Sequence, residues 1–283
     1  MKLILSRKGF DSANGGCPSP ILDGQLCSLP IPDAGSPTRY EKISFTGSSI
    51  AQIVEDLTRG RVRRDDGAHL DPDLRRDAIA RAARWRPIFG QAGAAQSHLG
   101  GHKIKKGDLF LFFGCFRRAE QVGGRFRFVR EAPKLHVIFG WLQVGRVAQA
   151  TDGLAAEIPW AATHPHLAAP DRYKNNTLYF AGDRHLSTSV NMSGGGTFER
   201  IAPRLILSQT DPYIGCSKWR LPLWFEPRGR PALSYHSKAN RWTEGATSTR
   251  LQSAYPGQEF VLDLDQYPEA RGWLRSIFAS GAR

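Results

Sequence analysis

Residues 6–16 carry a dense set of side chains that could do chemistry. After a short apolar strand they place two cations, one carboxylate and two small polar groups in one turn-rich stretch: Arg7, Lys8, Asp11, Ser12 and Asn14. A carboxylate surrounded by donors at a strand end is a common way to build a site. The alternative is an Asx turn, in which the side chain of Asp11 caps the backbone that follows it.

A second polar set lies among small residues at 90–101. Small residues let the backbone approach a ligand closely, and the amides of Gln91 and Gln96 offer donors and acceptors that suit the edge of a base or sugar. His98 could orient a water molecule. No Gly-Lys-Ser/Thr follows, so the stretch does not fit a Walker phosphate loop. The alternative is a small-residue helix packed tightly on a sheet.

Two histidines and two asparagines form a third set at 164–176. His164 and His166 have a spacing that can hold a metal, but no third His or carboxylate partner stands out. Asn175 and Asn176 favour polar contacts with a nucleic acid or sugar, because Asn can pair with adenine-like edges. The four cysteines form no CxxC pair and are expected to be reduced. We therefore expect no metal and no other cofactor.

Two further stretches mix cations with other side chains, and each has two readings. Residues 219–255 interleave Lys and Arg with aromatic residues that could stack on bases: Trp219, Trp224, Phe225, Tyr235, Trp242 and Tyr255. The alternative is an aromatic core beside solvated arginines. Residues 59–86 contain nine Arg and five Asp. They could follow a phosphate backbone or form a solvated, ion-paired face.

The charge of the whole chain favours a polyanionic partner. Its 283 residues carry 39 Lys and Arg against 26 Asp and Glu, a formal net charge of +13. Arg outnumbers Lys, and its planar fork grips phosphate through two hydrogen bonds. The alternative is a merely soluble basic surface. No apolar run of about 18 residues is present, so no membrane partner is expected. The amino terminus lacks the apolar core of a signal peptide, and a cytoplasmic location is expected.

Strands and helices must position these residues, and the apolar pattern of the sequence predicts where they lie. Apolar patterning predicts strands at 3–5, 109–113, 126–129, 136–147, 177–181, 204–208 and 258–262. It predicts helices that begin near 48 and at 71, and a third at 267–279. Glycines within 136–147 predict bulges or close backbone contacts. The chain therefore reads as a single α+β (mixed α/β) domain over residues 1–283, with a mixed or barrel-like sheet and a few flanking helices.

Several motifs together resemble one family along nearly the whole chain. They are LILSRKGFDSANGG, PSPIL, SLPIPD, HLDP, FGQAGAAQSHL, KGDLFLFFGCFR, HVIFGWLQVG, HPH, NNTLY and SKWRLPLWF. In this order they are similar to the nucleotide modification-associated domain 3 family. The resemblance implies a role in bacterial or phage systems that add, read or remove hypermodified DNA bases. It further suggests a phage-defence DNA glycosylase that excises glucosylated hydroxymethylcytosine and leaves abasic sites.

Such a reaction assigns roles to the polar sets. Breaking an N-glycosidic bond develops positive charge on the deoxyribose, which a carboxylate near C1′ can stabilise while it activates a water. Asp11 is the expected carboxylate and Asn14 the expected water-positioning residue. The substrate contacts are expected from Arg7, Lys8, Ser12, Gln91, Gln96, His98, His164, His166, Asn175 and Asn176. Lys8 as a Schiff-base nucleophile is a lesser option, and Asp33, Asp71 and Asp108 are the next carboxylates to test.

Two other functions remain open at this point. A non-catalytic reader of modified bases, similar to small PUA or ASCH barrels, would need the polar pocket but no reactive carboxylate. A base-modifying transferase would need a donor site. The chain lacks a Rossmann fingerprint and a Walker loop, so the transferase is the weaker alternative.

Overall fold

A computed structural model describes residues 1–183, 192–254 and 257–279. Its centre is a mixed ten-stranded sheet whose main path runs β17-β1-β9-β11-β12-β8. The strands of this path are β1 (Lys2–Arg7), β8 (Ile88–Gln91), β9 (Leu109–Val122), β11 (Leu135–Gln149), β12 (Thr177–Ala181) and β17 (Glu259–Asp263). Four strands pair alongside it: β2 (Ser19–Leu22), β3 (Gln25–Leu26), β10 (Arg125–Phe128) and β13 (Gly195–Thr197).

The two longest strands form the backbone of this sheet. β9 and β11 pair antiparallel from Leu109↔Gln143 to Phe116↔Leu135, and their central residues are fully buried. β1 runs parallel to β9 and antiparallel to β17, so the sheet is mixed. The register of β11 shifts at two glycines, as their presence in the strand predicted. A Cβ on Gly140 would lie 2.5 Å from Leu74 and one on Gly145 would lie 2.6 Å from the backbone of Gly182.

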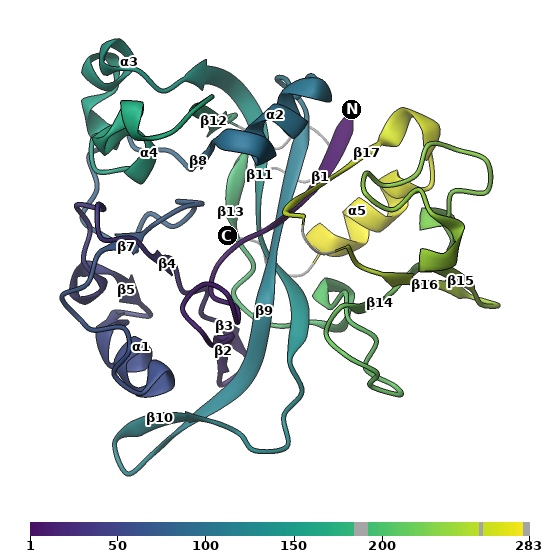
Figure 1. Cartoon of the computed structure of the whole chain (residues 1–283), viewed down its shortest axis with the longest axis horizontal. Coiled ribbons are helices and arrows are strands. Elements are labelled where there is room, and N and C mark those ends of the chain that lie inside the picture. The colour runs from purple at the N-terminus through teal and green to yellow at the C-terminus, as the bar shows by residue number, and fades with distance from the viewer. Residues whose placement is uncertain (184–191, 255–256, 280–283) are drawn as a thin grey trace.

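Smaller sheets and helices cover this centre. A three-stranded sheet consists of β14 (Lys218–Pro222), β15 (Trp242–Glu244) and β16 (Ser248–Gln252), and two strand pairs consist of β4 (Ile31–Pro32), β7 (Ala68–His69), β5 (Ser44–Phe45) and β6 (Ser48–Ser49). The helices are α1 (Ala51–Thr58), α2 (Gly93–Gly101), α3 (Asp152–Glu157), α4 (Pro165–Ala168) and α5 (Ala270–Phe278). In Figure 1, α1 lies to one side of β9 and α5 to the other.

Three apolar clusters hold these layers together. The largest joins the central strands to the three-stranded sheet and to Leu274, Ile277 and Phe278 of α5. The second packs α1, through Ile53, Val54 and Leu57, against the N-terminal segments. The third lies between β8, β12 and α3. α1 and α5 show the helical apolar period that sequence patterning detects, whereas the central strands are continuous apolar runs because both of their faces are buried.

Most predicted elements are confirmed, and three features differ. The helix predicted from residue 71 is absent: residues 71–86 contain no regular element, because Asp73 pairs as a β-bridge with Ile88 and Arg81 turns inward. The strand predicted at 204–208 is a 3-10 turn at Pro203–Leu205 with isolated bridges after it. Within the described residues the main sheet path ends at β17 and β8, so the sheet is open and does not close as the barrel-like prediction allowed.

No described helix is both long and apolar enough to cross a membrane. All four cysteines are free, with Cys17 and Cys27 buried and Cys115 and Cys216 half-buried.

Candidate functional site

A buried carboxylate, Asp71, lies at the centre of a histidine cluster. Only 4% of its side chain is exposed. Its Oδ1 accepts from the backbone N–H of Gly90 at 2.7 Å and lies 3.2 Å from Nε2 of His164, while its Oδ2 lies 3.9 Å from Nε2 of His166. Burial alone would raise the pKa of Asp71, but the hydrogen bond from His164 and the nearby imidazoles lower it to about 2. Asp71 is therefore ionised at neutral pH.

The amide of Asn176 orients the His166 ring. Its Nδ2 donates to the carbonyls of His166 and Pro170, both at 2.9 Å, which leaves Oδ1 to face the imidazole. That oxygen lies 2.6 Å from Nδ1 of His166, so Nδ1 carries the proton and Nε2 presents a lone pair toward Asp71. Burial lowers the pKa of His166 to about 4, which keeps the ring neutral.

His69 completes the cluster from the opposite side. Its Nδ1 lies 3.0 Å from Oδ2 of Asp33, whose other oxygen accepts from Arg172 at 2.7 Å. The rings of His69 and His166 meet edge to face with centroids 5.3 Å apart, and Tyr173 stacks on His166. One ligand atom from each of His69, Asp71 and His166 lies within 4.8 Å of the others.

Short local structures bring these side chains together. The pairing of β4 with β7 places His69 opposite Ile31 and sets Asp33 beside it. His164 caps α4 by accepting from the N–H of His166. Gly90 on β8 leaves the space that the His166 ring fills, because a Cβ there would lie 2.3 Å from its Cδ2. A side chain at position 90 would displace the ring.

A second buried carboxylate, Glu259 of β17, contacts the last residue of β8. Glu259 is 1% exposed and contacts Lys8 Nζ at 2.8 Å, Ser6 Oγ at 3.1 Å and Gln91 Nε2 at 2.6 Å, all through Oε1. Its Oε2 has no hydrogen-bond partner among the described residues. Gln91 follows Gly90, so consecutive residues of β8 contact the two carboxylates.

Residues 73–88 form a closed loop between these centres and a cleft. Asp73 and Ile88 exchange backbone hydrogen bonds at the base of the loop. Inside it, Arg81 forms an ion pair with the buried Asp73 and lies over the ring of Trp85. This buried ion pair fixes the loop in place of the predicted helix.

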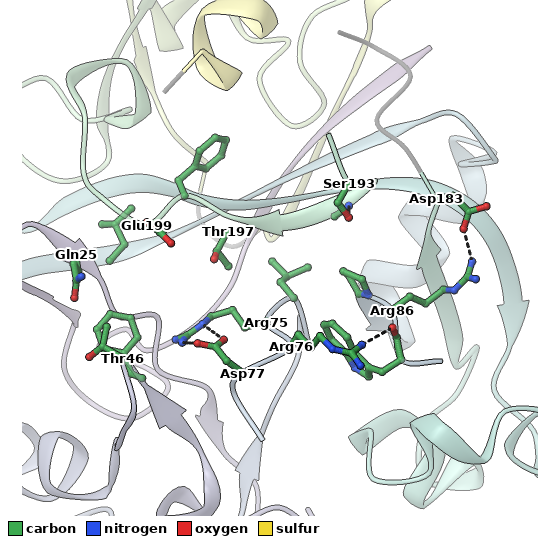
Figure 2. Close-up of a pocket in the computed structure, with 18 of the residues that line it drawn as sticks. Gln25, Thr46, Arg75, Arg76, Asp77, Arg86, Asp183, Ser193, Thr197 and Glu199 are labelled. Atoms are coloured by element: carbon green, nitrogen blue, oxygen red, sulfur yellow. Dashed lines mark hydrogen bonds and ion pairs between the residues drawn. The ribbon is translucent and has the colours of Figure 1, made fainter. Parts of the chain in front are cut away.

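The outer side of this loop lines a cavity of about 960 Å³ (Figure 2). Four arginines line it: Arg75, Arg76, Arg84 and Arg86. Arg75 pairs with Asp77 and Arg86 with Asp183, whereas Arg76 and Arg84 have no carboxylate partner among the described residues. Figure 2 shows Thr197 and Glu199 across the cavity from Arg75 and Arg76. We call this cavity the arginine cleft.

A narrower pocket adjoins the arginine cleft. Its volume is about 60 Å³, and it shares five lining residues with the cleft: Leu26, Phe45, Leu74, Arg75 and Thr197. Asp71 and Gly9 line its other walls. Asp71 thus lies directly before the loop that carries the four arginines.

The predicted residues 6–16 divide between two places. Asp11 Oδ1 accepts from the backbone N–H groups of Ala13 and Asn14 and from the side chain of Asn14, which is the Asx turn of the alternative interpretation. Ser12 is exposed in this turn. Lys8 instead reaches Glu259, and the backbone N–H of Arg7 donates to Gln258.

The other predicted residues divide between the two carboxylate centres and α2. His164, His166 and Asn176 belong to the Asp71 cluster. Gly90 and Gln91 end β8, and Gly93–Gly101 form α2, in which Gln96 and Leu99 are buried while its glycines have open space around them. The helix of the alternative interpretation is therefore present, but its small residues are not packed tightly on the sheet. Gln96 accepts from Tyr179, and His98 contacts Ser234. Asn175 donates to Ser97 of the same helix. These contacts join the two histidine-containing stretches, which the sequence separates by more than sixty residues.

Most of the predicted aromatic surface is core. Trp219, Phe225 and Trp242 are buried in the largest apolar cluster, as the alternative interpretation held, while Tyr235 is exposed. Tyr255 lies outside the described residues.

Sequence reasoning missed His69 and Glu259. His69 ends the short strand Ala68–His69 and Glu259 begins the strand Glu259–Asp263, and neither belongs to a spaced set of polar residues. Asp71 was only a secondary choice. The motif HLDP, which contains both His69 and Asp71, was the available signal.

Comparison with known proteins gives one match. A family model described as nucleotide modification associated domain 3 matches residues 2–263. No curated protein and no solved structure compared with the chain matches it.

Proposed function

The chain belongs to the nucleotide modification associated domain 3 family, and from this membership we propose that it is a DNA glycosylase. The substrate would be a hypermodified base such as glucosylated hydroxymethylcytosine in phage DNA, and the products would be the free base and an abasic site. This activity would serve antiviral defence. The observation that carries the proposal is the buried Asp71–histidine cluster on the same segment as the arginine cleft.

The chemistry requires a carboxylate and an acceptor for a proton. As the bond from C1′ to the base breaks, positive charge develops on the sugar, and the ionised Asp71 opposes it. The lone pair on Nε2 of His166 can accept a proton from the attacking water. Asp11, the carboxylate expected from sequence, already accepts three hydrogen bonds within its turn. We therefore assign the reactive role to Asp71.

The arginine cleft suits the rest of the substrate. An enzyme that acts on a base must take it out of the duplex stack. A cavity of about 960 Å³ is at the upper end of the range for small-molecule sites and has room for a nucleotide that carries a sugar. Arg76 and Arg84 would contact the flanking phosphates. Three carboxylates also line the cleft: Asp77, Asp183 and Glu199. They limit its positive charge and would weaken nonspecific binding of polyanions there.

The test measures strand breaks after alkali treatment. Purified protein is incubated with glucosylated-hydroxymethylcytosine DNA and with unmodified DNA of the same sequence. We expect breaks in the modified DNA alone. Asp71→Asn should lower the rate by about 10²–10⁴-fold, the usual contribution of general acid–base catalysis. Asp65→Asn, at an exposed position, is the matched control.

Two results would change the assignment. Loss of activity in Asp11→Asn with activity kept in Asp71→Asn would return the reactive role to the residue expected from sequence. Tight binding of modified DNA without any breaks would reject the glycosylase and support the non-catalytic reader. One observation favours that alternative: Oδ1 of Asp71 and Oε1 of Glu259 already accept hydrogen bonds from protein donors.

A further inference from the structure

The geometry points to a binding site for one first-row divalent transition-metal ion between His69, Asp71 and His166. The three side chains come from β7, the turn after it and α4, and their nearest ligand atoms lie within 4.8 Å of one another. Imidazole and carboxylate ligands bind such ions at about 2.0–2.2 Å. At these bond lengths the ligand atoms of a tetrahedral site lie about 3.4 Å apart, so the three side chains would draw together when the ion binds.

The proton positions leave acceptors facing one another. Nδ1 of His166 donates to Asn176, and Nδ1 of His69 donates to the Asp33 carboxylate, so both Nε2 atoms present lone pairs. Oδ2 of Asp71 lies 3.9 Å from Nε2 of His166, beyond hydrogen-bond distance. Three acceptors without a donor between them repel one another, and a cation removes that repulsion.

Each of the three proposed ligands also has a hydrogen-bond partner on the side away from the ion. Asp33 supports His69, Asn176 supports His166, and His164 with the Gly90 N–H supports Asp71. Metal-binding histidines almost always donate their second nitrogen to a carboxylate or carbonyl, which fixes the tautomer and orients the ring. Two imidazoles and one carboxylate suit Zn²⁺, Fe²⁺ or Mn²⁺ better than Mg²⁺ or Ca²⁺, which prefer oxygen ligands alone.

The ion would supply a nucleophile to the proposed reaction, and this step rests on the proposed function. Three protein ligands leave a position for water, whose pKa a divalent ion lowers strongly. Hydroxide on the ion together with Asp71 balances its two positive charges, so the centre would not repel the developing sugar cation. The hydroxide oxygen bonds to C1′ as the bond to the base breaks, and the base leaves with the electron pair and takes up a proton from solvent. With the ion bound, Nε2 of His166 is a ligand and not the proton acceptor, the bound water loses its proton to solvent, and Asp71 acts through the ion.

The first experiment measures metal binding without DNA. Protein stripped with a chelator is titrated with Co²⁺, and visible absorption reports coordination by nitrogen and oxygen. Titrations with Zn²⁺ and Mn²⁺ by calorimetry rank the ions. We expect one ion per chain. His69→Ala and His166→Ala should each weaken binding more than 100-fold, and Asp33→Asn by about 10–100-fold. The control is the double variant His98→Ala, His102→Ala, which removes a histidine pair with no carboxylate in the cluster.

A glycine pair gives a second, steric test. Gly90→Ala places a methyl group 2.3 Å from the His166 ring and should lower Co²⁺ affinity at least tenfold. Gly100→Ala on α2 has nothing within 4 Å of its new Cβ and should leave affinity unchanged. Equal affinity in Gly90→Ala and the unaltered protein would mean that His166 is not a ligand.

The outcomes separate the site from the reaction. If the histidine variants fail to fold, the Co²⁺ spectrum of the unaltered protein still decides, and no stoichiometric band would overturn the site. Affinity that depends on His98 and His102 instead would also overturn it. If the protein binds one ion but releases no base, the metal site is supported and the glycosylase proposal is rejected. If base release is unchanged in excess chelator, the glycosylase proposal is supported and the metal takes no part in the reaction.

Discussion

The buried histidines fall into two groups according to what their ring nitrogens contact. His69, His164 and His166 surround Asp71, so each has one nitrogen directed at or near a carboxylate. His136 and His236 lie in the core instead. Nδ1 of His136 accepts from the indole of Trp219 at 2.9 Å, and Nε2 of His236 accepts from the Ala254 N–H. An imidazole that accepts a hydrogen bond in an apolar core must stay neutral, so these two residues stabilise the fold only in that form.

The buried, neutral imidazole of His136 predicts that the free energy of unfolding falls in acid. Burial, with help from the charge of Arg7, lowers the pKa of His136 to about 3, although Asp11 opposes the shift. The unfolded value is about 6.5, so the stabilisation is complete above pH 6.5 and is lost as the pH falls toward 3. Burial lowers the pKa of His236 to about 4, which acts in the same direction.

The measurement is urea unfolding at pH 7 and at pH 4.5. Between these values His136 should account for roughly 2–3 kcal/mol of the lost unfolding free energy. His136→Asn keeps an acceptor for Trp219 but cannot titrate, so its loss should be smaller by that amount. An identical pH dependence in the variant and the unaltered protein would show that His136 does not control acid unfolding.

At the scale of elements, the loop 73–88 decides whether the arginines line a cleft. Its ends are joined by the Asp73–Ile88 bridge, and its interior is the buried pair of Arg81 with Asp73. A helix here would have separated Asp71 from Gly90 by the length of several turns. The loop instead returns the chain to the same point, so that the Gly90 N–H reaches Asp71.

Removal of the buried partner should open this loop. Arg81→Ala leaves the carboxylate of Asp73 buried without its cation, a change that costs about 3–5 kcal/mol in comparable cases. Arg127→Ala removes one partner of the exposed pair with Glu120 and should cost less than about 1 kcal/mol. Chemical denaturation measures both. Adding Asp73→Asn to Arg81→Ala should recover part of the lost unfolding free energy. If nothing is recovered, the unpaired charge of Asp73 is not the cause of the destabilisation.

At the scale of the whole molecule, net charge and local charge have different roles. The excess of +13 draws the protein to any polyanion through long-range attraction. In the arginine cleft, Arg75 pairs with Asp77 and Arg86 with Asp183, so two of the four arginines, Arg76 and Arg84, remain without a carboxylate partner among the described residues. The cleft should therefore contribute a small, defined number of phosphate contacts to a larger nonspecific attraction.

Salt dependence of DNA binding tests this division. Each phosphate contact contributes about 0.9 to the slope of log affinity against log salt concentration. Replacing both Arg76 and Arg84 with Ala should reduce that slope by about 2 and weaken binding. The control replaces Arg125 and Arg130, exposed residues that do not line the cleft, and removes the same charge. Fluorescence anisotropy at four salt concentrations measures both, and equal slopes in the two variants would remove the cleft from the interface.

The sequence alone determined the elements whose residues interact with near neighbours. The strands around Leu109–Val122, Leu135–Gln149 and Thr177–Ala181 follow from continuous apolar runs, because both faces of a central strand are buried. The helix Ala270–Phe278 follows from its apolar period, because a period records which face is buried. It also determined the sign of the charge and, through motifs in order, the resemblance to the family that the comparison then showed. The Asx turn at Asp11 was available as an alternative for the same reason, since its contacts are local.

Only the tertiary structure decided which polar residues meet. Asp71 contacts residues 90, 164 and 166, and Glu259 contacts residues 6, 8 and 91, across separations that leave no period in a single chain. The same holds for Arg81, whose ion pair with Asp73 prevents the helix that local propensity favours. A buried charge is stable only beside its partner, and the partner is chosen by the packing of the sheet rather than by neighbours in sequence.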